Sequence, residues 1–455
     1  MLLLENCFYL HSPEVDDPQA GWDVWISEGH IDEIVPTGTV SGEEHGFFSR
    51  IDCSSHVVVP GFINTHHHFY QALTRNLPAV QNAKLFDWLV HHYRIWEGID
   101  ENAVRVSTML ATAELLKTGC TASSDHHYLY PSSVKADLMS AQFDAATKTG
   151  IRFAPCRGSM SRGKSAGGLP PDSVVQDEET ILADCERVIR AFHDPAPDAM
   201  RKVILAPCSP FSVTTELLRE SAELAREQNV RLHTHLAETA DEEEYCLATH
   251  NKRPLELMEE CGFIGSDVTY AHGIHFNDEE LDRLARTGTG VCHCPSSNMR
   301  LGSGIARITE MHRKGVPVSI AVDGSASNDS SDYLGEMRAA LMLQRVRYGA
   351  EALSVRDVVG MATRGGAAAL GFTKSGQLSP GWTADVAIFD VQRLEYAGAL
   401  SDPLAALLFA GYDHGTAHTI VNGEVVVRDG ILATVDEDEL FARATEASDR
   451  LLARV

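Results

Sequence analysis

Residues 63–71, INTHHHFYQ, place three consecutive histidines directly after the apolar run VVVPGF. If this segment continues a β-strand, side chains two residues apart share a face. His66 and His68 would then point to one side and His67 to the other. Two imidazoles on one side can bind one metal ion. A polar loop of stacked histidines would have the same sequence, so this segment alone does not decide between the two interpretations.

Further histidine and carboxylate residues lie at the ends of other apolar runs. HTHLAE contains His233, His235 and Glu238, YAHG contains His272, and SIAVDG contains Asp323. Neutral imidazoles combined with a carboxylate suit zinc or iron, and three or four protein ligands leave a position for water in a catalytic site. Four such run ends together predict a catalytic metal site rather than a crowded loop.

These runs alternate with amphipathic helical segments between about residues 57 and 350, a pattern typical of parallel strands with crossover helices. Helical segments such as 101–119, 214–229 and 277–288 fill the gaps, and several begin at Asp, Thr or Asn and end at Gly. The pattern predicts a (β/α)8 barrel, whose reactive groups lie at the carboxyl ends of the strands. The expected strands are 57–68, 121–127, 152–158, 202–210, 231–238, 268–273, 289–295 and 317–324.

The segments at both ends of the chain lie outside the predicted barrel. Residues 1–56 contain short strand-like runs, and residues 374–432 contain ADVAIFD and the hairpin-like TIVNGEVVVRDG, with Asn422-Gly423 as its turn. We expect the two ends to meet as one small β-sandwich, with the barrel of residues 57–373 inserted between its halves. Residues 433–455 predict a closing helix.

Composition restricts the classes of function. The formal net charge of −26 repels phosphate backbones and anionic lipid surfaces, so neither nucleic acid nor a membrane is an expected partner. No stretch approaches the roughly 18 apolar residues of a membrane span. The N-terminal MLLLENCFYL predicts a strand rather than a signal peptide. Ten scattered cysteines without a CxxC pair fit a reducing compartment, so a cytoplasmic protein is expected.

The segments PGFINTHHH, HTHLAE, YAHGIH, CPSSNMRLGSG and VDGSASN resemble the amidohydrolase superfamily, specifically its branch of aromatic-base deaminases. The resemblance covers nearly the whole chain, since GQLSPGWTADVAIFD and VNGEVVVRDG also resemble segments of that family's C-terminal sandwich. It implies a hydrolase that acts on the C–N bonds of cyclic amidines and takes a small aromatic heterocycle as substrate. A homo-oligomer is one assembly that this resemblance allows.

The resemblance also implies roles for individual residues. His66, His68, His235 and Asp323 would hold one divalent metal, Zn²⁺ in first place and Fe²⁺ as the alternative. Glu238 would transfer protons, and His272 would polarise the attacking water or the developing tetrahedral centre, with Asp323 as a proton acceptor. Binuclear members have a bridging lysine at the end of strand four. This chain has Cys208 there and Lys202 only at the start of the strand, which implies a mononuclear site.

The substrate is inferred from local segments. HHHFYQALTR, LFDWLVHHYRIWEGI and APCSPFSV are most similar to the enzymes of the branch that convert 8-oxoguanine to uric acid and ammonia. Isoxanthopterin, guanine and triazines remain alternatives. Gln71, which has both a donor and an acceptor, would pair with the edge of the ring, Trp88 would cover its face, and Cys208 would contact a ring substituent. Trp88 lies on a helical apolar stripe, where a core position is the more common one, and Gln71 could only brace its loop.

Four other segments contain residues of a kind that could form a site. Residues 158–165, GSMSRGKS, match the phosphate-binding pattern GxxxxGK[ST], but AGGLPP follows where that pattern requires a helix, so a nucleotide-binding protein is the disfavoured alternative. Cys292-His293-Cys294 has no second cluster with structural zinc spacing, which favours a packed strand. His126 and His127 end strand two, so either could line the pocket or be structural, while His91 and His92 fit a helix surface or lid.

Overall fold

Parallel strands alternate with helices between residues 62 and 370 of the computed structural model, which describes residues 1–39 and 49–454. The second and third strands of the barrel are each broken into two short strands, the first in one sheet and the second in another. The two sheets are therefore continuous with each other. In barrel order the strands are β7 (Phe62–Asn64), β8 (Cys120–Ser123) with β9 (His126–His127), β10 (Arg152–Phe153) with β11 (Cys156–Ser159), β12 (Ile204–Pro207), β13 (Arg231–Leu236), β14 (Val268–His272), β15 (Gly290–His293) and β16 (Val318–Ile320).

The barrel closes between the last strand and the first. The Thr65 N–H donates to the Ile320 carbonyl at 3.4 Å, and the hydroxyl of Tyr333 lies 2.7 Å from the Ile63 carbonyl and 3.0 Å from that of Ile320. Just beyond, the Asp323 N–H donates to the His66 carbonyl at 3.2 Å. The predicted TIM-type barrel is therefore confirmed, and its first and eighth strands hold their chemical groups next to each other.

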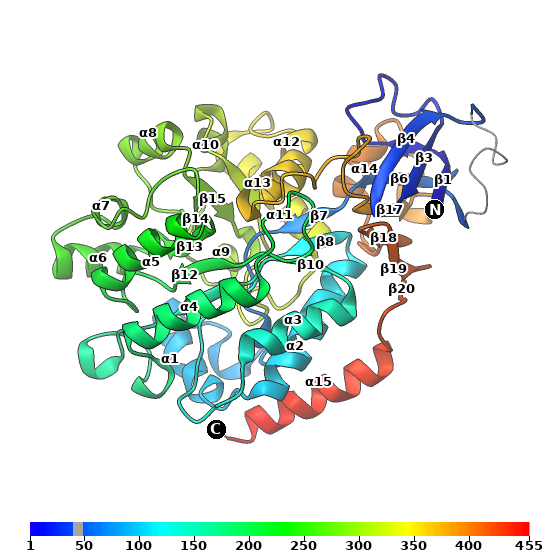
Figure 1. Ribbon diagram of the computed structural model, residues 1–455. Coiled ribbons are helices and arrows are strands. Elements are labelled where there is room, and N and C mark those ends of the chain that lie inside the picture. Colours follow the sequence, from blue (N-terminus) through cyan, green and yellow to red (C-terminus); the bar gives the residue numbers. More distant parts are fainter. Residues whose placement is uncertain (40–48, 455) are drawn as a thin grey trace.

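Helices surround the barrel (Figure 1). The three helical segments expected at 101–119, 214–229 and 277–288 are α2, α5 and α8, and each begins after a side-chain cap, Asp100, Thr214 or Asn277. The helices of this part are α1 (Leu85–Trp96), α2 (Glu101–Lys117), α3 (Leu138–Thr149), α4 (Glu178–Phe192), α5 (Thr215–Glu227), α6 (Ala240–His250), α7 (Pro254–Glu260), α8 (Asp278–Thr287), α9 (Pro295–Arg300), α10 (Ile308–Lys314), α11 (Tyr333–Tyr348), α12 (Val355–Gly360) and α13 (Gly366–Leu370).

The single strand expected over 57–68 is wrong. The chain leaves one sheet at Gly61 and enters the barrel, so β6 (His56–Pro60) pairs antiparallel with β17 (Val386–Asp390), while only β7 is a barrel strand. A Cβ atom at Gly61 would lie 2.1 Å from Oγ1 of Thr121, so the crossing point has room only for glycine. The histidines therefore follow β7 in extended chain rather than lying within a strand.

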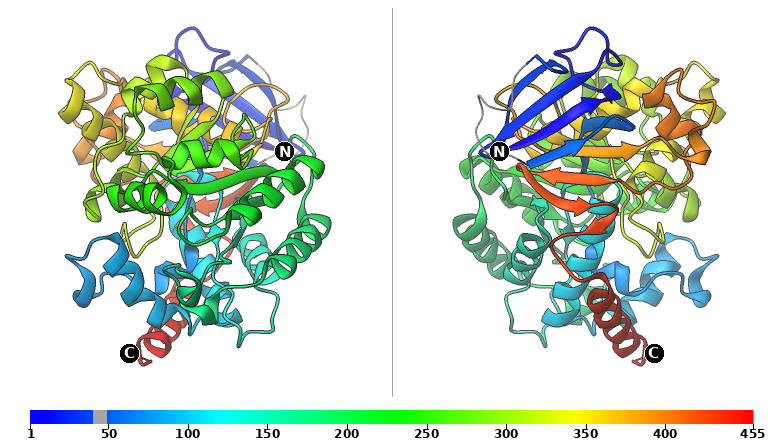
Figure 2. Two further views of the ribbon diagram at one scale, coloured as in Figure 1. Left: turned by 90° about the vertical axis from the view of Figure 1, so that its left-hand side faces the viewer. Right: turned by 90° about the vertical axis from the view of Figure 1, so that its right-hand side faces the viewer.

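Strands from both chain ends lie side by side next to the barrel (Figures 1 and 2). The two sheets share an apolar core that includes Leu4, Val24, Ile388 and Ile420. The turn at Asn422 and Gly423, both with positive φ, connects the predicted hairpin. One sheet contains β4 (His30–Pro36), β3 (Trp22–Ser27), β1 (Leu2–Cys7) and β5 (Ser49–Asp52), and the other contains β2 (Tyr9–Leu10), β6, β17, β18 (His418–Val421), β19 (Glu424–Arg428) and β20 (Ile431–Leu432).

The last helix, α15 (Glu437–Leu452), lies along α2 (Figure 1). Glu437 forms an ion pair with Lys117 at 2.6 Å, and the hydroxyl of Ser448 donates to the Leu73 carbonyl at 2.7 Å. The helix expected within 433–455 is therefore present, although residue 455, like residues 40–48 of the expected N-terminal part, lies outside the described residues. None of the described helices has the length and apolar character needed to cross a bilayer.

A buried ion pair connects the barrel to these outer sheets. Arg152 of β10 donates to both carboxylate oxygens of Asp385, at 2.9 and 3.1 Å, and the two side chains are 0% and 2% exposed. Asp385 also accepts hydrogen bonds from the Asn422 N–H and the Thr383 hydroxyl. Burial alone would raise the pKa of Asp385, but Arg152 and these donors hold it below its ordinary value.

We predict that Asp385→Asn lowers the free energy of unfolding at pH 7 by about 3–5 kcal/mol, because it leaves the Arg152 guanidinium buried without a counter-charge. A depressed carboxyl pKa contributes stability above the unfolded pKa, and this contribution is lost as the pH falls through the folded value. The gap between variant and wild type should therefore shrink on acidification. Urea titrations at several pH values measure it, with the exposed Asp32→Asn as control; a gap that does not change with pH would contradict the assignment.

Candidate metal centre and active site

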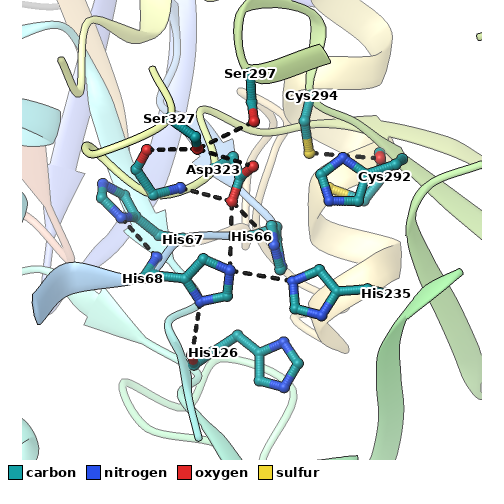
Figure 3. Close-up of polar contacts among 12 residues, drawn as sticks. His66, His67, His68, His126, His235, Cys292, Cys294, Ser297, Asp323 and Ser327 are labelled. Atoms are coloured by element: carbon teal, nitrogen blue, oxygen red, sulfur yellow. Dashed lines mark hydrogen bonds and ion pairs between the residues drawn. The ribbon is translucent and has the colours of Figure 1, made fainter. Parts of the chain in front are cut away.

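Six polar side chains from four strand ends meet at the carboxyl end of the barrel. Nε2 of His66 and Nε2 of His68 lie 3.3 and 3.4 Å from Oδ1 of Asp323, and Nε2 of His68 lies 3.1 Å from Nε2 of His235 (Figure 3). Glu238 and His272 lie beside them, with Oε2 and Nε2 3.6 Å apart. All six side chains are buried. The structure therefore brings together every residue that the sequence predicted for metal binding and proton transfer.

Hydrogen bonds fix which nitrogen of each ring carries a proton. Nδ1 of His68 lies 2.8 Å from the His126 carbonyl, and Nδ1 of His235 lies 2.6 Å from the Cys208 carbonyl. A carbonyl only accepts, so each Nδ1 must be the protonated donor. Nε2 of both rings is then a free lone pair, which is the form that binds a metal.

His66 is oriented by a second histidine rather than by a carbonyl. Nδ1 of His233 lies 2.8 Å from the Thr269 carbonyl and donates to it, which leaves Nε2 of His233 as an acceptor. Nδ1 of His66 lies 2.8 Å from that acceptor and must donate to it. The chain of hydrogen bonds from Thr269 through His233 to His66 thus leaves the Nε2 lone pair of His66 facing Asp323.

This arrangement fits a cation. The Nε2 atoms of His68 and His235 face each other at 3.1 Å with no proton to share, so their lone pairs repel unless a positive charge lies near both. Nε2 of His66 is buried and has no hydrogen-bond partner among the described residues. Two overlapping groups with the spacing of metal ligands are present there, His66, His68, His126 and His235 in one and His66, His272 and Asp323 in the other.

The two carboxyl groups of the site have opposite electrostatic environments. Burial would raise the pKa of Asp323, but its close contacts with His66 and the neighbouring imidazoles hold the pKa well below its ordinary value. Burial raises the pKa of Glu238. Burial would lower the pKa of His272, but the charges of Glu238 and Asp323 outweigh this and raise it. Asp323 is therefore suited to accept a proton and Glu238 to supply one.

The backbone is strained where three of these strands end. Ala237, His272 and Asp323 have φ values of 54°, 71° and 62°, in the left-handed region that residues with a Cβ rarely adopt. Such conformations persist only where the surrounding contacts fix them. Each of these residues is, or directly precedes, a polar residue of the site, so the sharp turns aim those side chains into the barrel mouth.

A cavity lies over the cluster. His68, His235, Glu238, His272 and Asp323 line its floor, and further lining side chains are mostly apolar or aromatic, as in many small-molecule sites. The three residues predicted to contact substrate all line it, together with Leu85, Leu89, Tyr93, Tyr128, Ser209, Phe211, Leu301 and Ser327. Helix α1 alone contributes Leu85, Trp88, Leu89 and Tyr93, so it forms one wall.

Two residues that orient the side chains of the site have no role predicted from the sequence. Asn298 accepts a hydrogen bond from Nδ1 of His272 at 2.9 Å, and His233 orients His66. The spacing of His233 and His235 on one strand face was a usable signal, whereas Asn298 follows strand seven in a short helix with no periodic signal. His67 points away from the cluster, as expected, with Nε2 3.0 Å from the Ser331 hydroxyl.

The other segments considered as sites do not form a second site with the predicted chemistry. One lies on the surface, and the histidines of the others pack beside the cluster or in helix α1. Lys164 is in a three-residue 3-10 helix and exposed, so no helix N-terminus faces a phosphate there. Nε2 of His126 donates to the Ala206 carbonyl at 3.0 Å, and its ring stacks on that of His235 at 4.8 Å. His92 is buried on α1, so of the two positions expected for it, helix surface or lid, the helix surface is wrong; its Nδ1 lies 2.9 Å from the Trp88 carbonyl.

Comparison with known proteins agrees with this geometry. The chain is 46% identical to the 8-oxoguanine deaminase of Pseudomonas aeruginosa over 94% of both chains. It is 39% identical to the hydroxydechloroatrazine ethylaminohydrolase of Pseudomonas sp. strain ADP, over 94% of this chain and 90% of the relative. The crystal structure of atrazine chlorohydrolase from Arthrobacter aurescens TC1, complexed with zinc, superposes with a TM-score of 0.92 at 28% identity, covering 98% of this chain and 100% of that one.

The deaminase and aminohydrolase relatives are hydrolases of C–N bonds, and this chain is an enzyme of the same class. Residues 57–426, which contain all of the barrel strands and every residue of the metal cluster, match the model of the Amidohydrolase family. The chain therefore belongs to the amidohydrolase family.

Proposed function

We propose that the protein is a mononuclear, zinc-dependent deaminase that converts 8-oxoguanine and water to uric acid and ammonia. The observation that carries the proposal is that the histidine and aspartate cluster and the Glu238–His272 pair open into one aromatic-lined cavity. The 46% identity to an 8-oxoguanine deaminase supports the choice of substrate. Isoxanthopterin, guanine and triazines are the alternatives to be tested.

In this proposal His66, His68, His235 and Asp323 hold the ion. A divalent cation bound there lowers the pKa of water toward 7, so that hydroxide is available at neutral pH. Zn²⁺ suits three neutral imidazoles and one carboxylate, and Fe²⁺ suits them as well. Lys202 does not reach the cluster, because its ammonium group donates to the carbonyls of Asp194 and Ala196. This supports a single ion rather than a lysine-bridged pair.

The chain's own residues move the protons. Asp323, held ionised by its imidazole neighbours, accepts a proton as water attacks the ring carbon that carries the amine. Glu238, whose pKa burial raises, gives a proton to the adjacent ring nitrogen, which concentrates positive character on that carbon. His272 donates from Nε2 toward the developing oxygen while Asn298 holds its Nδ1. Asp323 then passes its proton to the amine, and collapse of the tetrahedral centre breaks the C–N bond and releases ammonia while the hydroxyl proton returns to Glu238.

The cavity walls suit a flat, polar ring. Trp88, Tyr93 and Phe211 can cover its faces, and Gln71 and Cys208 can contact its edge. Gln71 also accepts a weak hydrogen bond from the Ala326 N–H at 3.3 Å, which leaves its amide N–H groups to face an acceptor on the ring. We propose these three predicted contacts, Gln71, Trp88 and Cys208, as the substrate-binding set.

The first experiment is ammonia release from 8-oxoguanine, guanine, isoxanthopterin, cytosine and melamine with metal-loaded enzyme. The highest kcat/KM is expected for 8-oxoguanine. Release from a pterin or a triazine only would retain the metal mechanism and overturn the assigned substrate. No release from any of the five would overturn both.

Two substitutions separate metal binding from proton transfer. His235→Ala should lose bound metal and activity together. Glu238→Gln should keep wild-type metal content but lose roughly two or more orders of magnitude in kcat, as removal of a general acid does. Metal content by elemental analysis and kcat under saturation measure the two effects, and wild-type turnover in Glu238→Gln would exclude its role as the proton donor.

Replacing His233 tests the hydrogen-bond chain behind His66. His233→Leu removes the acceptor for Nδ1 of His66 and should weaken zinc affinity by about 10–100-fold, the range for lost partners of metal ligands. His233→Gln, whose amide oxygen can accept the same hydrogen bond, should recover part of the loss. Competition with a zinc chelator measures the affinity without reference to turnover, and equal affinity in both variants and wild type would contradict the orientation argument.

A further inference from the structure

The loop after β13 contains a glutamate whose side chain is used in an unusual way. Residues 239–242, TADE, have the pattern of a capping box, in which the glutamate accepts a hydrogen bond from the N–H of the capping residue. Thr239 does cap α6, accepting the Glu242 N–H at 3.3 Å. The Glu242 carboxylate instead passes over Thr239 and accepts the N–H groups of Ala237 and Glu238, at 2.9 and 3.0 Å.

The helix after the next strand shows the ordinary arrangement. At the start of α8, Glu280 accepts the Asn277 N–H at 2.8 Å and its own N–H donates to the Asn277 side chain at 3.0 Å. Both helices follow a barrel strand and both carry a buried glutamate at the third position. Only at α6 does that carboxylate reach back to the strand end itself.

The turn that Glu242 holds is the one that aims Glu238. Ala237 has a φ of 54°, which its Cβ disfavours. Its N–H is bound by Glu242, and its carbonyl accepts the N–H groups of Ile274 and His275 at 2.8 and 3.0 Å. The peptide units on both sides of Ala237 are thereby fixed, and the next side chain, Glu238, lies 3.6 Å from His272.

Helix capping alone does not explain a carboxylate in this place. Glu242 is 1% exposed, and burial raises its pKa to about 7, so the protein keeps the group there against a desolvation cost. The adjacent Asp241, in the first turn of the same helix, is exposed and carries no such cost. The two hydrogen bonds that the Glu242 carboxylate accepts both come from the backbone of the Ala237–Glu238 turn. That turn is therefore what the carboxylate supports.

We propose that Glu242 is a positioning residue for the deamination reaction: its carboxylate clamps the backbone N–H groups of Ala237 and Glu238 and so holds the Glu238 carboxyl against His272. The proposal rests on the proton-transfer role assigned to Glu238. Glu242 does not line the cavity and acts only through the residue that it holds.

Glu242→Gln tests the clamp with little change in volume. The amide keeps one acceptor oxygen, but its NH₂ group opposes the second backbone N–H, so one of the two hydrogen bonds must break. We expect kcat to fall about 10-fold, KM to change less than about 2-fold and zinc content to stay at the wild-type level. Glu280→Gln is the control, since it changes a buried glutamate at the same helix position that binds Asn277 and Arg253 rather than the Ala237–Glu238 turn, and it should leave kcat unchanged.

A double-mutant cycle separates positioning from general structural damage. If Glu242 acts through Glu238, then Glu242→Gln should cost less than about 2-fold in kcat when Glu238 is already Gln, because nothing is left to position. An equal loss in both backgrounds would overturn the proposal. If Glu242→Gln does not fold, Glu242→Ala takes its place, and failure of both to fold would also overturn it, since the carboxylate would then be required for folding itself.

The crystal structure of Glu242→Gln tests the clamp independently of turnover. The expected result is that Ala237 leaves positive φ and the distance from Glu238 to His272 increases. An unchanged turn would overturn the proposal whatever the kinetics show. If instead Glu238→Gln alone retains wild-type kcat, the proton-transfer role fails, and the structure of Glu242→Gln still decides whether the clamp holds the turn.

Discussion

Two unprotonated nitrogens, Nε2 of His68 and Nε2 of His235, face each other at 3.1 Å in the mouth of the barrel. Their Nδ1 atoms are committed to backbone carbonyls, so neither ring can turn a proton toward the other. The repulsion between the two lone pairs can be relieved by a cation that both of them bind. The surrounding structure has to hold the rings in place against that repulsion, and the carbonyl acceptors do so from strands two and four.

The barrel supplies these acceptors because parallel strands end at one edge. Cys208 follows strand four and His126 lies in strand two, so their carbonyls reach rings that belong to other strands. The same edge explains the left-handed backbone at His272 and Asp323, since a strand that must present its side chain inward and then turn out to a helix has little chain in which to do so. The ordering of the site is therefore a property of strand ends rather than of any one motif.

Side-chain chemistry at strand ends was predictable from the sequence, because a strand fixes which residues share a face and where they point. This reasoning located His66, His68, His235 and Asp323, and their burial and distances agree with it, although His66 and His68 lie in extended chain after β7 rather than in the strand expected for them. The break at Gly61 was not predictable, since VVVPGFINT has one continuous apolar pattern and only the contact of Gly61 with Thr121 shows that the chain changes sheets there.

The hydrogen-bond partners of side chains in loops could not be predicted from the sequence, for a related reason. The pattern TADE is typical of a helix capped by Thr239, as α6 is, but no local rule states that Glu242 accepts hydrogen bonds from the two residues before the cap, because the path of the preceding turn sets its partners. Trp88 posed the same difficulty, since its helical spacing fits a core position as well as a cavity wall. In the structure it is both, because it is buried in an apolar cluster with Tyr70 and Trp96 and also lines the cavity.

The two carboxyl groups of the site show how one cavity can support opposite proton transfers. Asp323 accepts the Gly324 N–H at 2.6 Å and the Ser327 hydroxyl at 3.3 Å and lies between imidazoles, so its charged form is stabilised several times over. Glu238 is equally buried, yet among the described residues its carboxyl has only the imidazole of His272 as an ionic partner, at 3.6 Å. Burial therefore raises its pKa above the ordinary value. The difference lies in how many donors each turn provides, so the strained backbone that aims the two side chains also shifts their pKa values in opposite directions.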